Sequence, residues 1–343
     1  LLHNLVSGAM VLASPSSVKA LENPEPADAD SQALRRLWKG AGLFEGARPR
    51  LETSLALTDA ARPNLLFRGP GGIFAVSLPA GDPLADQLNT ILSRQQYTNS
   101  EEELPHTAQV CRVEVAGETY SAFEGGQPSS GDMTRDDARF YIIRRVAETI
   151  CASNHHVALV CHASAVAQKG RSLILLGTSG RGKTTTALGL LEAGCQQVAD
   201  DHVPIGLDGT SALGFPGAIA LKSGTWSLPE AQPFLKSSTL PQVRDGSRYV
   251  TAPYAVDTGD RLPVAALVFP NYDPDHDPDV APNMVRMQPE EVLVAAVQAG
   301  ARIAPGSRTA GPLATMCNTI PAWHLTYASS QQSVPACLSL LNS

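Results

Sequence analysis

Residues 177–184 read Gly177-Thr178-Ser179-Gly180-Arg181-Gly182-Lys183-Thr184 and fill every fixed position of the pattern Gly-x-x-x-x-Gly-Lys-Thr. Chemistry dictates this spacing, because glycines let consecutive backbone N–H groups turn around a phosphate and deliver it to a helix N-terminus. In such a loop the lysine reaches the β- and γ-phosphates, and the hydroxyl that follows it helps to hold Mg²⁺. The stretch therefore predicts a nucleotide-binding site that runs through Thr185, with ATP and Mg²⁺ as cofactors.

The residues on either side predict the strand and the helix that this loop requires. Arg171–Leu176 is a short apolar run of the kind found in buried strands. After the loop, apolar residues recur at helical spacing between Ala187 and Leu191, and Gly194 is positioned to end the helix. Strand, glycine loop and helix follow one another in the required order, which predicts an α/β fold built around a P-loop.

Composition limits the classes of protein to which the chain can belong. It has 343 residues, long enough for two domains, with 43% apolar and 17% charged residues as in globular proteins. The net charge of −7 provides no basic excess to neutralise phosphates, so we expect no nucleic-acid partner. No apolar run approaches the roughly 20 residues of a membrane span, so we expect no membrane partner. The six cysteines form no C-x-x-C pair, and reduced thiols together with ATP chemistry predict a cytoplasmic protein.

The chain divides into three predicted regions. Residues 1–33 hold several prolines and an acidic cluster, which predicts a flexible tail. Residues 34–133 contain short strand-type and helical runs without a catalytic constellation, and predict a smaller α+β accessory domain. The glycine-rich segment 125–131 predicts a linker. A helical run then leads into the P-loop kinase domain, residues 134–343.

Two further features accompany the loop. Asp200-Asp201 follow the apolar pair Val198-Ala199 at the predicted end of a strand. A carboxylate placed there can hold Mg²⁺ together with Thr184, and a second carboxylate can accept the proton of an attacking hydroxyl. His162 precedes Gly177 by 15 residues and lies at the mouth of the phosphate site if the two strands pair.

The loop, His162 and the segment Val198–Val203 resemble the catalytic domain of HPr serine kinases over about residues 134–343. The stretches His162–Ala167 and Leu221–Trp226 look like HPr-kinase-related proteins, some of which phosphorylate a serine of a precursor peptide, including lasso-peptide precursors. The resemblance implies a P-loop mixed sheet of the type shared with phosphoenolpyruvate carboxykinases. It also implies a peptide or small protein as acceptor, and self-association as a homo-oligomer.

The resemblance also implies roles for individual residues. Lys183 and Thr184 would handle phosphate and Mg²⁺, and the Asp200/Asp201 pair would supply the general base and a metal contact. His162 would lie near the reacting phosphate. The sequence does not distinguish which aspartate is the base, and Asp201 is the preferred assignment.

The chain departs from the HPr kinases at one segment. An acidic metal contact of the family is missing from Ala220–Gly224, where Lys222 stands as a candidate phosphate ligand instead. This departure puts the reverse dephosphorylation reaction in doubt, and HPr itself as substrate. Arg261, ahead of an apolar strand, is a candidate for the family's phosphate-binding arginine, and a surface arginine is the competing interpretation.

These features predict an ATP- and Mg²⁺-dependent kinase that phosphorylates a hydroxyl, in the first place a serine of a peptide or small protein. One alternative is a small-molecule kinase or a carboxykinase-like enzyme, although the additional His/Lys metal pair and substrate arginines of carboxykinases are not found. The other alternative is a non-catalytic nucleotide-binding regulator. The intact lysine and the two acids argue against it, since a sensor needs no base.

Overall fold

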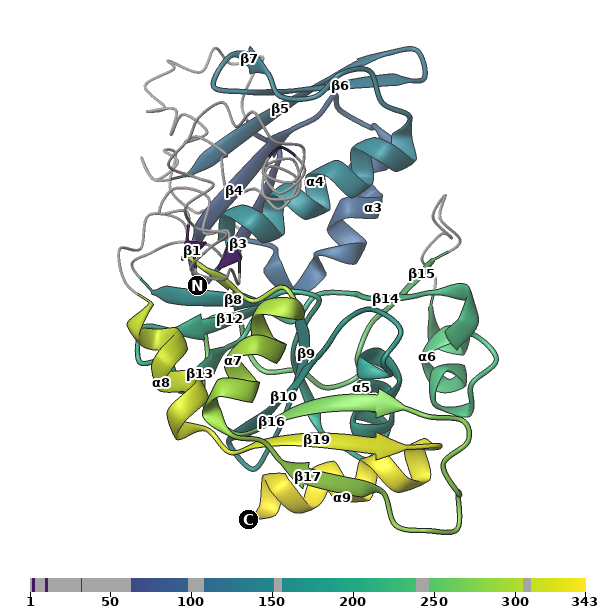
Figure 1. Cartoon of the computed structure of the whole chain (residues 1–343). Helices are drawn as coiled ribbons and strands as arrows, with labels where there is room; N and C mark the ends of the chain where they lie inside the picture. Colours follow the sequence, from purple (N-terminus) through teal and green to yellow (C-terminus); the bar gives the residue numbers. More distant parts are fainter. Residues whose placement is uncertain are drawn as a thin grey trace.

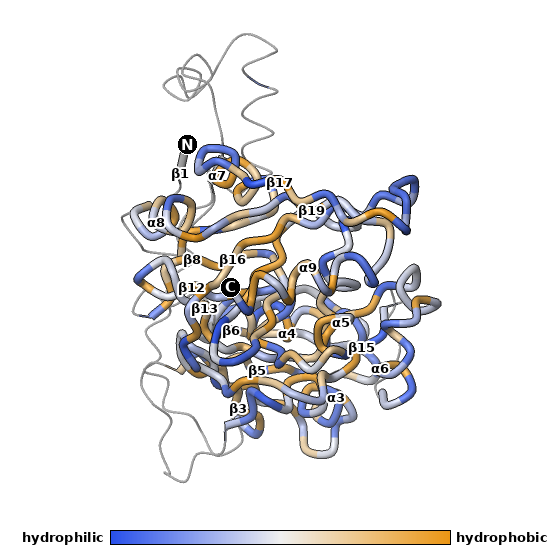
Figure 2. The backbone as a smooth tube through the Cα atoms, turned by 90° about the horizontal axis from the view of Figure 1, so that it is seen from below, coloured by the Kyte–Doolittle hydropathy of each residue, from blue (hydrophilic) through white to orange (hydrophobic). Residues whose placement is uncertain are grey.

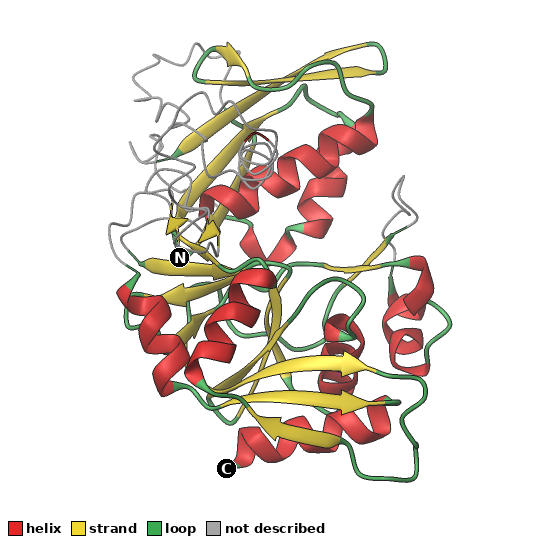
Figure 3. Ribbon diagram, in the orientation of Figure 1, coloured by secondary structure: helices red, strands yellow, loops and turns green. Residues whose placement is uncertain are grey.

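The computed structural model describes residues 2–3, 10–11, 32, 63–97, 108–150, 156–238, 247–304 and 310–343. Within them the chain has an α/β fold, with helices packed on mixed β-sheets (Figure 3). The tail predicted for residues 1–33 lies mostly outside the described residues. Of it the structure describes an antiparallel pair, β1 (Leu2–His3) with β2 (Met10–Val11). Most of the first third of the predicted accessory domain also lies outside the described residues.

A five-stranded sheet occupies the upper part of the molecule in Figure 1. Its strands, in spatial order, are β3 (Leu65–Gly69), β4 (Gly72–Ser77), β5 (Gln109–Ala116), β6 (Thr119–Glu124) and β7 (Gln127–Pro128). Neighbours are antiparallel except β4 and β5, which are parallel. Helices α3 (Pro83–Ile91) and α4 (Arg135–Ile150) pack together against this sheet, and the short helix η2 (Ser93–Gln95) follows α3.

The segment 125–131, predicted as a linker, instead continues the five-stranded sheet. Gln127 lies opposite Glu124 in the β6–β7 hairpin, and the intervening glycines 125 and 126 adopt positive φ as a tight turn requires. Helix α4 is capped by Thr134, whose hydroxyl accepts a hydrogen bond from the Asp137 N–H at 3.2 Å. It packs on β4 and β6. The predicted division of the chain at residue 134 stays a prediction.

The second sheet has ten strands, both parallel and antiparallel. Its main path runs through β11 (Gln196–Asp200), β9 (Ala163–Gln168), β10 (Arg171–Leu176), β16 (Arg261–Tyr272), β13 (Ser211–Leu213), β12 (Val203–Gly206), β8 (Val157–Cys161) and β18 (Arg302–Ile303). The second half of β16 also pairs with β19 (Ala322–Tyr327), which in turn pairs with β17 (Asn283–Arg286). Strands β10, β16 and β19 are parallel, which sets their carboxyl ends at one edge.

The two faces of this sheet are buried by different helices. On β10, Leu173 and Leu175 join a core with α5 (Lys183–Glu192) and α9 (Ser330–Asn342), while Ile174 and Leu176 join a second core on the other side. This alternation is the period of two expected of a strand buried on both faces. Helices α7 (Pro289–Gln298) and α8 (Gly311–Thr319) contribute to the second core. Figure 2, in which the backbone is coloured by the hydropathy of each residue, shows hydrophobic residues around β8, β12, β13 and β16.

The remaining described elements form a small appendage beside α5. Strand β14 (Ile219–Leu221) pairs with β15 (Arg248–Val250), and the segment between them includes η3 (Ser223–Thr225), η4 (Pro229–Ala231) and α6 (Gln232–Ser237). Among the described helices, none combines the length and the apolar character that crossing a bilayer requires.

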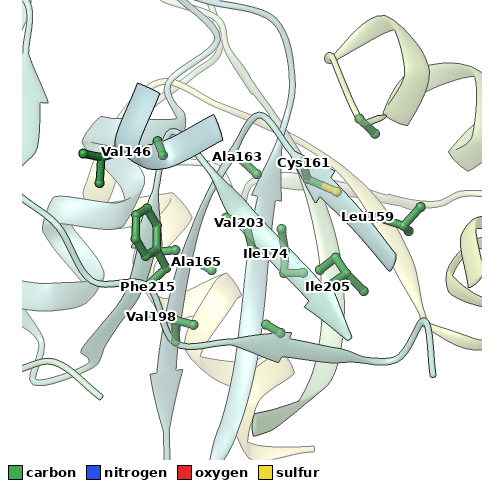
Figure 4. Close-up of a cluster of buried hydrophobic side chains, with 14 of the residues drawn as sticks. Val146, Leu159, Cys161, Ala163, Ala165, Ile174, Val198, Val203, Ile205 and Phe215 are labelled. Atoms are coloured by element: carbon green, nitrogen blue, oxygen red, sulfur yellow. The ribbon is translucent and has the colours of Figure 1, made fainter. Parts of the chain in front are cut away.

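A continuous core joins the two sheets. Val146 of α4 belongs to the same buried cluster as Ala163 and Ala165 of β9 and as Phe215, and Figure 4 shows these side chains together. Backbone and side-chain bonds reinforce the contact, because the Ala218 N–H donates to the Ile91 carbonyl at 3.2 Å and the Arg94 guanidinium donates to the Ala252 carbonyl at 2.8 Å.

Candidate functional site

Strand register brings the glycine loop and the two aspartates to the same edge of the large sheet. Strand β9 lies between β10 and β11 and is antiparallel to both, so that Ser164 faces Leu175 on one side and Asp200 on the other. Because neighbouring strands are about 4.8 Å apart, Asp200 lies about 10 Å across the sheet from the end of β10. His162 immediately precedes β9 and therefore falls on this edge as well.

The glycine loop has the backbone conformation that its sequence predicts. Gly177, Gly180 and Gly182 have φ values of 151°, 85° and 93°, a region that favours glycine. None of the N–H groups from Thr178 to Gly182 donates a hydrogen bond within the part of the chain described. Consecutive backbone donors of this kind at a helix start attract an anion. The donor chemistry of the loop thus fits a phosphate chain.

Lys183 opens helix α5 and folds back over the loop. The residue is only 8% exposed. Its Nζ donates to the Gly177 carbonyl at 2.6 Å and to the Thr178 carbonyl at 3.1 Å. Burial lowers the pKa of this ammonium, while the carboxylates of Asp201 and Asp200 oppose that change.

Tyr327, at the end of β19, fixes the start of α5. Its hydroxyl lies 2.9 Å from the Thr186 hydroxyl and donates to the Gly182 carbonyl at 3.3 Å. A Cβ on Gly182 would clash with this hydroxyl, so the glycine is required both by its φ and by close packing. The sequence gives no signal for this role of Tyr327, since an aromatic residue at a strand end is an ordinary core feature.

Other loop residues are placed as follows. Lys222 does reach the loop, because its Nζ donates to the Ser179 hydroxyl at 2.8 Å. Arg181 turns outward and donates to the Asn271 side chain at 2.7 Å. Thr184 and Thr185 occupy the first turn of α5 and are half-buried. Within the described part of the chain the Thr184 hydroxyl makes no hydrogen bond.

Asp200 is the more basic member of the acid pair. The Ser164 hydroxyl donates to its carboxylate at 2.5 Å. The pKa of Asp200 is raised to about 6, because burial and, to a smaller extent, the neighbouring Asp201 carboxylate raise it while the Ser164 hydrogen bond opposes them. Nothing in the sequence indicates a role for Ser164. Only the register of β9 against β11 identifies it as the hydrogen-bond partner of Asp200.

Asp201 has the opposite character. Its backbone φ of 64° is in the left-handed region, and its side chain is 62% exposed. His162 Nδ1 lies 2.8 Å from the carboxylate, and His202 Nδ1 lies 3.8 Å away. The hydrogen bond from His162 lowers the pKa of Asp201. Left-handed backbone at a non-glycine residue is uncommon, and among the described residues Asp201 shares it with Lys169 of the β9–β10 turn.

Two histidines therefore flank one carboxylate. The sequence indicated His162, which is 43% exposed, but passed over His202 although it directly follows the acid pair. Burial lowers the pKa of His202, and the Asp201 carboxylate opposes that change. The oxygen donors on this edge, the Asp200 carboxylate and the Thr184 hydroxyl, are the ligand type that Mg²⁺ takes. Within the described part of the chain, no three His, Cys, Asp or Glu side chains form a metal-binding group by themselves.

Arg261 is not brought to this edge. It begins β16, and since Val264 faces Ser172 in the parallel pair, the start of β16 lies at the edge opposite the glycine loop. Its guanidinium pairs instead with Asp208 at 2.7 Å and with the Ser211 hydroxyl at 3.3 Å. The interpretation of Arg261 as a phosphate ligand is therefore not supported, and its competing interpretation as a surface arginine fits these contacts.

Comparison with known proteins adds a structural similarity. No protein-family model matches the chain, and no curated protein matches it. A solved structure described as the HPr(Ser) kinase/phosphatase from Coxiella burnetii aligns with 12% sequence identity and a TM-score of 0.29, over 53% of this chain and 94% of that one.

Proposed function

We propose that the protein is an ATP- and Mg²⁺-dependent kinase that transfers the γ-phosphate to a hydroxyl, in the first place a serine of a peptide or small protein. The observation that carries the proposal is the meeting of three parts at one edge of the sheet. These are a loop with unpaired N–H groups, the buried Lys183, and the Asp200/Asp201 pair. The resemblance of the sequence to HPr serine kinases supports the choice of a serine acceptor.

Each group has a role in the proposal that its surroundings support. The loop amides and Lys183 bind the β- and γ-phosphates and stabilise the charge that develops on them during transfer. Lys222, held beside Ser179, adds a second cation at the loop. The ionised Asp200 and the Thr184 hydroxyl are the groups that would hold Mg²⁺, which would neutralise charge on the phosphates.

Asp201 is the proposed general base. Its exposed carboxylate is the one that an acceptor hydroxyl can approach, whereas Asp200 is less accessible and hydrogen-bonded to Ser164. His162 orients the carboxylate through the 2.8 Å contact. In the transfer step the acceptor oxygen loses its proton to Asp201 and attacks phosphorus in line, and the bond from phosphorus to the β–γ bridging oxygen breaks.

The direct test is incubation of the protein with γ-³²P-labelled ATP, MgCl₂ and a degenerate library of serine-containing peptides. Label on the peptides, absent from a matched library with alanine in place of serine, supports the proposal. Label on small metabolites from a cell extract, with none on peptides, replaces it with a metabolite kinase. Binding of ATP without any transfer replaces it with a regulator.

A further inference from the structure

The glycine loop lies between two groups of strands that end at the same edge of the large sheet. Strand β9, which His162 precedes, and strand β11, which ends at Asp200, lie on one side of β10. Strands β16 and β19 lie on its other side, and because they run parallel to β10 their last residues also reach this edge (Figure 1). The proposed function places the γ-phosphate at the acid pair. A nucleoside triphosphate in the loop therefore directs its nucleoside the other way, over the ends of β16 and β19.

Tyr272 is the last residue of β16 and stands directly beside the loop. Its N–H donates to the Arg181 carbonyl at 3.3 Å, and its Cβ lies 3.5 Å from the position that a Cβ on Gly182 would occupy. Its ring packs edge-on against the Tyr327 ring, with centroids 6.1 Å apart and the planes inclined by 66°. These contacts hold the ring in place, yet Tyr272 is 49% exposed. A ring that is fixed and half-exposed offers a platform for a flat ligand.

The separation of the acid pair from this ring suits a nucleotide. Strands β11, β9, β10 and β16 follow one another in the sheet, so the strand of Asp200 and the strand of Tyr272 are about 14 Å apart at the usual strand spacing. A triphosphate and a ribose can bridge that distance. A second aromatic residue, Trp226 of the appendage that carries Lys222, is half-buried and has the Arg248 guanidinium 4.5 Å from its ring centroid. Tyr272 is therefore the more open of the two rings.

We propose that Tyr272 stacks on the base of the bound nucleotide and that the site takes a purine nucleoside triphosphate. This inference rests on the proposed function, because it needs the triphosphate to run from the acid pair across the loop. Loss of an aromatic side chain that stacks on a base weakens binding about 5- to 150-fold. The two fused rings of a purine cover more of the tyrosine than the single ring of a pyrimidine, so purines gain more from the contact.

The test titrates the full chain, in the presence of MgCl₂, with ATP, GTP, CTP and inorganic tripolyphosphate by isothermal titration calorimetry. We expect ATP and GTP to bind about threefold or more tighter than CTP, and about tenfold or more tighter than tripolyphosphate, which lacks a base. Equal affinities for ATP and tripolyphosphate overturn the inference and leave the proposed function standing. If neither ligand binds, the proposed function fails and the inference fails with it. Equal affinities for ATP and CTP overturn the assignment to purines.

Matched variants locate the base. Tyr272→Leu should weaken ATP about tenfold and change tripolyphosphate by less than about twofold, whereas Tyr272→Phe keeps the ring and should bind ATP within about twofold of the unaltered protein. Tyr254→Ala is the control, since Tyr254 is 62% exposed and its carbonyl accepts from the N–H of Gln197, near the start of β11 and away from the loop. It should change neither affinity. If Tyr272→Leu weakens ATP and tripolyphosphate equally, the ring supports the loop and not the base, and the inference is overturned.

Discussion

Asp200 and Asp201 are adjacent in the chain, yet their carboxylates have opposite acidities because their surroundings differ. Burial raises the pKa of Asp200 to about 6, whereas the His162 hydrogen bond lowers the pKa of Asp201. Pairs of titratable groups whose environments separate their pKa values are a common source of acid–base assignments. In the proposed function, Asp200 is the group that would hold a cation and the exposed Asp201 is the base.

Replacing Asp200 by asparagine should stabilise the metal-free protein at pH 7.5. A carboxyl with a raised pKa in the folded state costs stability above that pKa, and the cost is lost as pH falls toward the unfolded value near 3.8. The gain in the free energy of unfolding should be about 1–3 kcal/mol at pH 7.5 and vanish near pH 4. Urea unfolding at both pH values measures it. A gain that persists at pH 4 would contradict the assigned cause.

Replacing Asp201 by asparagine should abolish phosphate transfer and leave nucleotide binding largely intact. Loss of a positioned base costs roughly 100- to 10,000-fold in rate. Asparagine tolerates the left-handed backbone at this position, so the fold is kept and the comparison isolates the carboxylate. Label transfer and fluorescent-nucleotide titration measure the two effects. Transfer at the unaltered rate would remove Asp201 from the role of base.

At the scale of elements, the first turn of α5 and the end of β19 act as one unit. Tyr327 contacts Gly182 and Thr186 across the sheet–helix interface, so the loop conformation is set from outside the loop. The loop pattern in the sequence predicts the glycines but not their contact with Tyr327.

Gly182→Ala and Gly180→Ala should separate steric clash from backbone strain. Both glycines have positive φ, but a Cβ on Gly182 meets the Tyr327 hydroxyl, whereas one on Gly180 has open space. We expect Gly180→Ala to cost about 1 kcal/mol of stability and Gly182→Ala clearly more, with loss of ATP affinity. Thermal unfolding and nucleotide titration provide the measurements. Equal costs would show that the packing against Tyr327 is unimportant.

The elements around the loop could be predicted because their signals are local. The apolar run Arg171–Leu176 is β10 with the predicted bounds, and the helix predicted after the loop is α5. Helix α8 and strand β17 were not predicted, since short runs without strong periodicity carry little signal.

The residues of the candidate site also divide into those that the sequence indicated and those that depend on the fold. The spacing of the sequence indicated the loop and Asp200/Asp201, but Ser164 and Tyr327 contact them only through strand pairing. The sequence left both interpretations of Arg261 open for a related reason, because its position depends on which end of a 12-residue strand it occupies. Residue type cannot reveal that. The domain division and the roles of the site residues stay predictions.

At the scale of the whole molecule, one apolar cluster extends from the five-stranded sheet into the large sheet. It includes Phe67 and Val146 on one side and Ile174 and Leu267 on the other, all fully buried. A shared core of this kind couples the stabilities of the two parts.

Val146→Ala should therefore destabilise both parts together. Removing two buried methyl groups costs about 2 kcal/mol, including the cavity left behind. Guanidinium unfolding followed by far-ultraviolet circular dichroism and by proteolysis of each part should show coincident transitions that shift equally. A shift confined to the five-stranded sheet would show that the two parts unfold independently.

The position of Lys183 has a consequence for ligand selectivity. With its ammonium already satisfied by two carbonyl oxygens of its own loop, an incoming anion must displace those bonds before it gains the cation. Charge-assisted bonds of this kind are each worth about 1.5–3 kcal/mol. A lone sulfate or phosphate ion exchanges one set of contacts for another at little net gain, whereas a polyphosphate long enough to span the amides as well has a surplus. In the proposed function, the resting loop would therefore favour a polyphosphate over a small anion.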